Sequence, residues 1–108
     1  MQTQITQQQI NFFEMTKAEI ISRISEKTGV EKTTALVVVE SLMLEIKESI
    51  RQNESVFLRG FGTFLARKRK EKTGRNISKN TTIIIPEHHI PAFKPAKIFK
   101  EEVKKNVK

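Results

Sequence analysis

The sequence predicts an α+β fold, in which a mainly helical body carries a small antiparallel sheet and a protruding pair of strands. Helical periodicity occupies the chain from residue 16 to about residue 52, strand patterns follow from residue 56, and a short helical pattern closes the chain. The 108 residues are the length of one domain.

The composition leaves this domain short of hydrophobic core. Only 37% of the residues are hydrophobic, 30% are charged, and Trp, Tyr and Cys are absent. Disulfides are therefore excluded, and two His residues without Cys argue against a structural zinc site. Because small domains often need an additional source of stability, the composition predicts a dimer.

The charge is strongly basic. Twenty Lys and Arg residues face twelve Asp and Glu residues, which gives a formal net charge of +8. Such a field attracts polyanions, so nucleic acid, an anionic membrane surface and an acidic protein all stay open at this point. No apolar run approaches the roughly 18 residues of a membrane span, and no secretion signal is visible, so a cytoplasmic location is expected.

Residues 1–14 differ from the rest, because they are rich in Gln and offer only Phe12 and Phe13 as hydrophobic anchors. We expect them to form a flexible extension, or to lie upstream of a true start at Met15. Residues 15–108 are then the folded domain.

The first helix is predicted to begin at Thr16, where Thr16 and Glu19 form a capping-box pattern. Gly29 is expected to end it. Its apolar face consists of Ile20, Ile21 and Ile24.

The second helix is predicted from about Lys32 to about Gln52, with Glu31 as a poor N-cap residue. Its apolar positions form two neighbouring stripes: Leu36, Val39, Met43, Ile46 and Ile50, and Ala35, Val38 and Leu42. A helix that is apolar around so much of its circumference is covered on more than one side, and a second copy of the chain is the nearest cover.

A short strand at residues 56–58 leads to a glycine turn at residues 60–62 and to a new strand from Thr63. From Arg67 to Arg75 the new strand is basic. Side chains alternate along a strand, so Arg67, Arg69 and Arg75 share one face, and Lys68, Lys70 and Lys72 share the other. Neither face can be buried, so the strand is expected to leave the body.

Residues 74–80 are predicted to form a turn, and the β-branched residues 81–85 the returning strand. Pro86 and Pro91 suit a kink or an edge. The resulting arm, at about residues 62–91, has roughly 12 residues a side and is about 40 Å long. The last helix is predicted to hold Pro95 in its first turn and to turn Phe99, Val103 and Val107 inward.

Two features indicate an anionic partner. A basic strand with a β-branched partner strand favours a binding arm over a solvated charge run. Lys17 lies at the start of the first helix, and Lys97 and Lys100 at the start of the last, where each cation opposes the helix dipole by about 0.3–1 kcal/mol. Docked anions would explain these lysines, and tolerated surface positions would too.

Several segments resemble the HU/IHF family of bacterial DNA-bending proteins. They are residues 15–19 (MTKAE), 60–64 (GFGTF), 73–76 (TGRN) and 90–95 (IPAFKP), and the resemblance extends from Met15 to about Val107. It implies an intertwined dimer, of identical chains or with a paralogue, whose β-arms enter the minor groove of double-stranded DNA and bend and compact it with little sequence specificity. It also implies a place on the bacterial nucleoid.

The resemblance also implies site residues. Those of the arm are Arg67, Arg69, Lys72, Arg75, Asn76 and Lys79, and those that touch phosphates on the body are Lys97 and Lys100, with Lys17 less firmly. Ile77 stands where the family usually has an intercalating proline, and isoleucine is also used as such a wedge. Asn80 replaces the usual glycine of the tip and can adopt the same left-handed conformation.

Other functions find less support. No nucleophile with a base, phosphate loop or metal cluster indicates an enzyme, so no cofactor, metal or small-molecule substrate is expected. A membrane-surface protein would need a basic amphipathic helix, and a helix-turn-helix regulator a polar recognition helix. The adjacent His88 and His89 are predicted to be ordinary surface residues.

Overall fold

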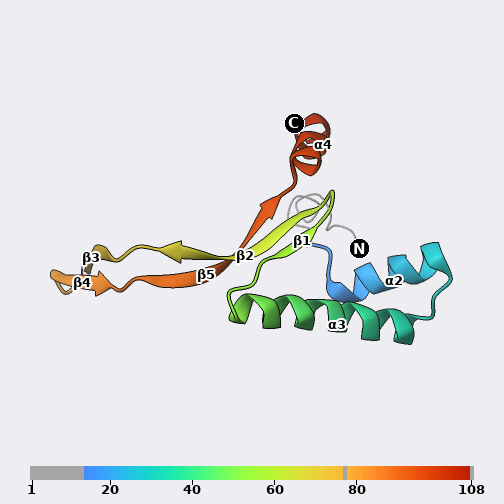
Figure 1. Cartoon of the computed structure of the whole chain (residues 1–108), viewed down its shortest axis with the longest axis horizontal. Helices are drawn as coiled ribbons and strands as arrows, with labels where there is room; N and C mark the ends of the chain where they lie inside the picture. Colours follow the sequence, from blue (N-terminus) through green and yellow to red (C-terminus); the bar gives the residue numbers. More distant parts are fainter. Residues whose placement is uncertain (1–13, 77, 108) are drawn as a thin grey trace, which may run out of the picture. The chain divides into compact units, whose positions relative to one another are not determined.

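The computed structural model describes residues 14–76 and 78–107. The chain divides into two compact units, with the boundary between Met43 and Leu44. The elements confirm the predicted α+β class (Figure 1). In order they are α2 (Lys17–Thr28), α3 (Lys32–Arg51), β1 (Val56–Leu58), β2 (Gly62–Arg69), β3 (Lys72–Asn76), β4 (Thr81–Ile85), β5 (His88–Pro95) and α4 (Lys97–Asn106).

The first unit is built from α2 and the beginning of α3, and α2 has the caps that the sequence predicts. The backbone N–H of Glu19 donates to the Thr16 hydroxyl at 3.3 Å, and the Thr16 N–H donates to the Glu19 carboxylate at 3.2 Å. This reciprocal pair confirms the capping box. Gly29 ends the helix with a φ of 80°, and its N–H donates to the carbonyl of Ser25.

The second unit contains a three-stranded antiparallel sheet in the order β1-β2-β5. Val56 pairs with Phe64 and Gly62 with Pro95, so the chain returns past its own turn. Four phenylalanine rings pack together with centroid separations of 4.7 to 6.1 Å. They are Phe61, Phe64, Phe93 and Phe99, and they fasten α4 to the sheet.

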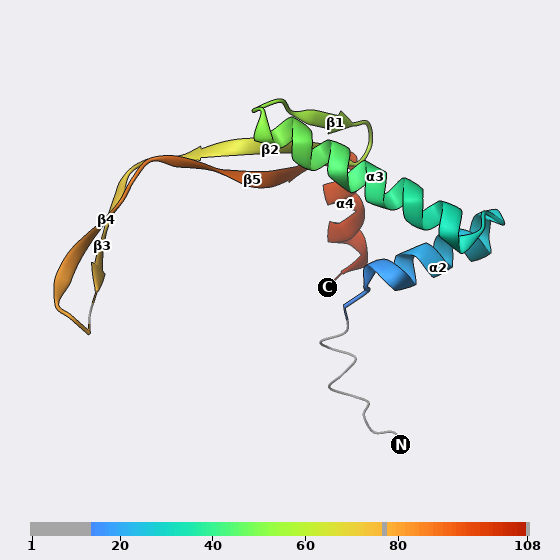
Figure 2. The same cartoon turned by 90° about the horizontal axis from the view of Figure 1, so that it is seen from below.

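Beyond this sheet, the strands β3 and β4 pair as a separate two-stranded ribbon (Figure 2). The prediction of a turn over residues 74–80 is wrong at its start, because Gly74 to Asn76 belong to β3 and pair with Thr81 to Ile83. Pro86 lies at the interruption between the ribbon and the sheet, and Pro91 lies in β5, which is an edge strand. Both prolines therefore occupy the kind of position that the sequence predicts.

The predicted start of the last helix is also wrong. Pro95 is the final residue of β5, and α4 begins at Lys97 with Ala96 as its N-cap. The cause is an extended connection, since the Ala96 N–H donates to the Phe61 carbonyl at 2.9 Å. Of the predicted inward stripe only Phe99 is partly buried, while the side chains of Val103 and Val107 are 45% and 68% exposed in the single chain.

The single chain buries very little apolar surface. Within residues 14–76 and 78–107, Ile21 and Ala35 are the only hydrophobic residues that are fully buried. Helix α3 ends at Arg51, one residue before the predicted end, and much of its apolar surface faces solvent. Its exposed apolar residues are Leu36, Val37, Val38, Leu42, Met43 and Leu44. This surface fits the prediction that the chain needs a second copy to complete its core.

Gly62 is a close-approach position in the sheet. A Cβ added there would lie 2.6 Å from the carbonyl oxygen of Lys94 and 2.6 Å from the ring of Phe93. We predict that Gly62→Ala lowers the free energy of unfolding by about 1–3 kcal/mol, because the strand pair or the Phe93 ring must shift. Chemical denaturation measures this. The control is Gly74→Ala, where an added Cβ meets nothing within 4 Å, and equal stability of the two variants would contradict the prediction.

Candidate nucleic-acid interface

The arm is the two-stranded ribbon that runs from Arg67 to its pairing partner Ile90. Arg69 pairs with His88 in the sheet, and Lys72 pairs with Ile85 in the outer ribbon. Two residues on one strand therefore lie opposite two residues on the other at the interruption, so the register is the same on both sides. The two sheets form one ribbon that passes through a joint without a bulge.

The register decides which side chains share a face, because directly opposed residues of an antiparallel pair point to the same side. One face carries Arg67, Arg69 and Arg75, opposite Ile90, His88 and Thr82. The other face carries Lys68 and Lys72, opposite His89 and Ile85. All five of these cations are exposed, as the sequence pattern predicts for a strand that leaves the sheet.

The arm cations differ in whether they already have an acidic partner. Lys68 forms a salt bridge of 2.7 Å with Glu87 across the ribbon. In the described part of the chain, no salt bridge forms at Arg67, Arg69, Lys72 or Arg75. These four side chains, all of them predicted site residues, therefore keep their charge available to an anion.

The tip of the arm is closed by a hydrogen bond between two predicted residues. Asn80 has a φ of 51°, which confirms the left-handed conformation expected there. Its side-chain oxygen accepts a hydrogen bond of 2.5 Å from the Arg75 guanidinium. Of the other predicted tip residues, Asn76 ends β3 opposite Thr81 and Lys79 is exposed in the turn. Ile77 lies outside the described residues.

The predicted body residues are separate from the arm. Lys97 and Lys100 are exposed in the first turns of α4, beyond the end of β5 that lies away from the arm. At about 3.3 Å per residue, that strand puts roughly 26 Å of backbone between them and the joint. Lys17 is the first residue of α2 and forms an ion pair with Glu40. The sequence does not predict the ion pairs of Lys17 and Lys68, since both depend on tertiary or cross-strand placement.

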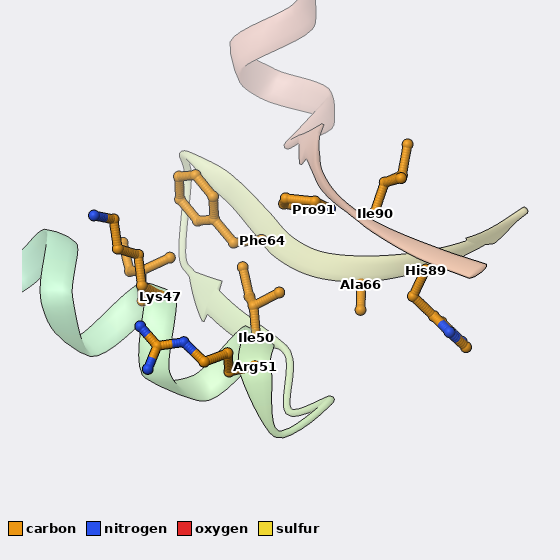
Figure 3. Close-up of a pocket in the computed structure, with 9 residues that line it drawn as sticks. Lys47, Ile50, Arg51, Phe64, Ala66, His89, Ile90 and Pro91 are labelled. Atoms are coloured by element: carbon orange, nitrogen blue, oxygen red, sulfur yellow. The ribbon is translucent and has the colours of Figure 1, made fainter.

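An apolar cavity of about 550 Å³ also lies in the second unit, between the end of α3 and the sheet (Figure 3). Ile46 and Ile50 line it from the helix. The sheet contributes Phe64, Ala66, Ile90 and Pro91. Lys47, Arg51 and His89 lie at its margin, so a polar ligand would find few partners inside.

Membrane-spanning helices and metal clusters are both absent from the described residues. None of the helices there is long and apolar enough to cross a membrane. No group of three or more His, Cys, Asp or Glu side chains is placed to hold a metal ion within that same part of the chain.

Known proteins similar to this chain are consistent with one another. A family model described as bacterial DNA-binding protein matches residues 15–104. The DNA-binding protein HU of Thermus thermophilus is 38% identical over 91 residues, which cover 84% of this chain and 94% of that protein. The prophage-derived DNA-binding protein HU 2 of Bacillus subtilis is 42% identical over 90 residues, covering 83% of this chain and 98% of the relative.

Solved structures agree with these matches. A cocrystal structure of Anabaena HU with DNA superimposes with a TM-score of 0.78 at 37% sequence identity, and it covers 82% of this chain and 97% of the Anabaena chain. HU from Thermotoga maritima superimposes with a TM-score of 0.58 at 27% identity, covering 82% of this chain and 98% of that one.

Proposed function

Because the chain belongs to the family of bacterial DNA-binding proteins that includes HU, we propose that it is an architectural protein that bends and compacts double-stranded DNA. The observation that carries the proposal is the arm, whose arginines are exposed and form no salt bridge within the described part of the chain. Its relatives are named as DNA-binding proteins, so the protein acts by binding and not by catalysis.

Affinity comes from the phosphate backbone. Arg67, Arg69, Lys72, Arg75 and Lys79 are proposed to replace the counterions condensed on the duplex, and the release of those ions drives binding. The hydrogen bond between Arg75 and Asn80 supports this role, since it orders a long side chain before DNA arrives. Asn76, which ends β3, is proposed as a further contact.

The arm is proposed to read the minor groove. That groove presents a degenerate pattern of donors and acceptors, so binding there discriminates little between sequences. Preference should follow how easily a duplex deforms, and a kinked or nicked duplex deforms most easily. Ile77 is proposed as the wedge at the tip. Unstacking one step costs a few kcal/mol, which the larger contact surface of a bent duplex offsets.

The protein is a dimer, of identical chains or with a paralogue. The exposed apolar surface of α3 and the cavity between α3 and the sheet need a cover, and a second copy provides it. Two copies also supply two arms, so one duplex can be held at two points and bent between them.

Body contacts extend this interface. Lys97 and Lys100 are exposed at a helix start, where free N–H groups and cations together suit a phosphate. Lys17 is a weaker candidate because it already pairs with Glu40. Both side chains of that pair are about half exposed, so breaking it costs no more than about 1 kcal/mol.

Residues 15–108 are proposed as the DNA-binding domain, with residues 1–14 as an extension that lies, up to residue 13, outside the described residues. The protein is associated with DNA, and we place it on the bacterial nucleoid in the cytoplasm. The family match at residues 15–104 supports this assignment.

The salt dependence of binding tests the arm. In the double variant Arg69→Ala/Arg75→Ala, the slope of log K against log salt concentration should fall by about 0.9 for each phosphate that the arm no longer neutralises. Fluorescence anisotropy with a random duplex measures the slope. The control is Arg23→Ala/Arg51→Ala, which removes the same charge from α2 and α3. An unchanged slope in the arm variant would mean that the arm does not touch the backbone.

A bending measurement tests the wedge. Ile77→Ala should reduce DNA bending more than it reduces affinity, because the phosphate contacts remain while the step at the tip is no longer unstacked. Energy transfer between dyes at the two ends of a duplex measures the bend. Ile84→Ala, which removes an exposed isoleucine from the ribbon itself, is the control. If Ile77→Ala bends DNA as the wild type does, the residue is not a wedge.

A further inference from the structure

The joint of the arm contains a small hollow that the proposed function does not use. Lys70 and Glu71 lie there opposite Pro86 and Glu87, between the two paired segments of the ribbon. The hollow has a volume of about 500 Å³. Its lining residues are Arg69, Lys70, Glu71, Lys72, Ile85 and His88, and we call it the joint hollow.

The lining gives the joint hollow a positive charge. Three cationic side chains face one carboxylate, and among the described residues none of these four groups forms a salt bridge. Glu87, the nearest other acid in sequence to His88, is already paired with Lys68. A concave surface with excess charge of one sign concentrates ions of the opposite sign, so this hollow suits an anion.

His88 is held in a defined orientation at this hollow. Its Nδ1 lies 2.9 Å from the carbonyl oxygen of Pro86. A carbonyl oxygen can only accept, so Nδ1 must carry the proton and donate. Nε2 is then a lone-pair acceptor in the neutral ring and a second donor in the imidazolium. Because His88 pairs directly with Arg69, the imidazole and the guanidinium lie on the same face of the ribbon.

We propose that the joint hollow binds one backbone phosphate of the bound duplex, with His88 donating from Nε2 beside Arg69. This proposal rests on the proposed function, since it presumes that DNA lies along the arm. A neutral imidazole would turn its Nε2 lone pair toward the phosphate oxygens, so binding favours the protonated ring. A phosphodiester has no proton of its own to exchange near neutral pH, so the histidine supplies the coupled proton.

The adjacent histidine gives a matched comparison. His89 pairs with Lys68 and therefore lies on the opposite face of the ribbon. It borders the apolar cavity between α3 and the sheet and does not line the joint hollow. The two residues have the same chemistry and neighbouring positions, but only His88 is placed to meet the phosphate.

The test is the affinity for a random duplex measured between about pH 5.5 and pH 8, the range in which histidine titrates, at constant ionic strength. Wild-type affinity should rise as the pH falls, by about ten-fold for each arm that gains a charge-assisted hydrogen bond. His88→Ala should bind almost equally at both ends of the range and should match the wild type at pH 8. His89→Ala should keep the wild-type dependence.

A second readout measures how many phosphates are neutralised. The wild-type slope of log K against log salt concentration should be steeper at pH 5.5 than at pH 8 by about 0.9 for each arm. In His88→Ala the two slopes should agree. Thermal melting of both variants checks the fold, which should be unaffected because both side chains are exposed.

Two results would overturn the proposal. One is a His88→Ala variant that keeps the wild-type pH dependence, and the other is a His89→Ala variant that loses it. A wild-type affinity that does not change with pH would also overturn the phosphate site, yet DNA binding itself would stand. An absence of duplex binding at every pH would instead overturn the proposed function.

Discussion

The antiparallel pairing between residues 62–76 and 81–95 is the constraint on which the rest of this structure depends. At one end Gly62 admits the Phe93 ring and the Lys94 carbonyl, which fixes the register inside the aromatic cluster. At the other end the same register places Asn76 opposite Thr81. A slip of one residue would move every arm cation to the other face and would bring a side chain into the space that Gly62 leaves.

The scarcity of core and the length of the arm follow from one allocation of residues. About a third of the chain forms a ribbon with two exposed faces, so it contributes little to a hydrophobic core. The helices must therefore find their missing cover in a second copy, and α3 keeps a wide apolar surface for it. Dimerisation thus stabilises the fold and also supplies the pair of arms that bending requires.

Local chemistry allowed much of the fold to be predicted from sequence. The capping box at Thr16, the left-handed Gly29 and Asn80, and the exposed basic strand each depend on a few neighbouring residues. The errors arose where distant pairing overrides local preference. Gly74 joins a strand because Ile83 pairs with it, and Pro95 stays extended because β5 continues its pairing as far as Gly62. The ion pairs of Lys17 and Lys68 likewise depend on partners that local patterns do not reveal.

The most direct test of the account is to remove the arm without disturbing its base. Arg69 and His88 are directly paired, so a two-residue Asn-Gly turn can replace residues 70–87 and close the hairpin. Sedimentation and thermal melting should show an intact dimer. We predict that its affinity for duplex DNA falls steeply, because only the body lysines remain to meet the phosphates. An intact dimer that binds duplex DNA as tightly as the full chain would contradict the account.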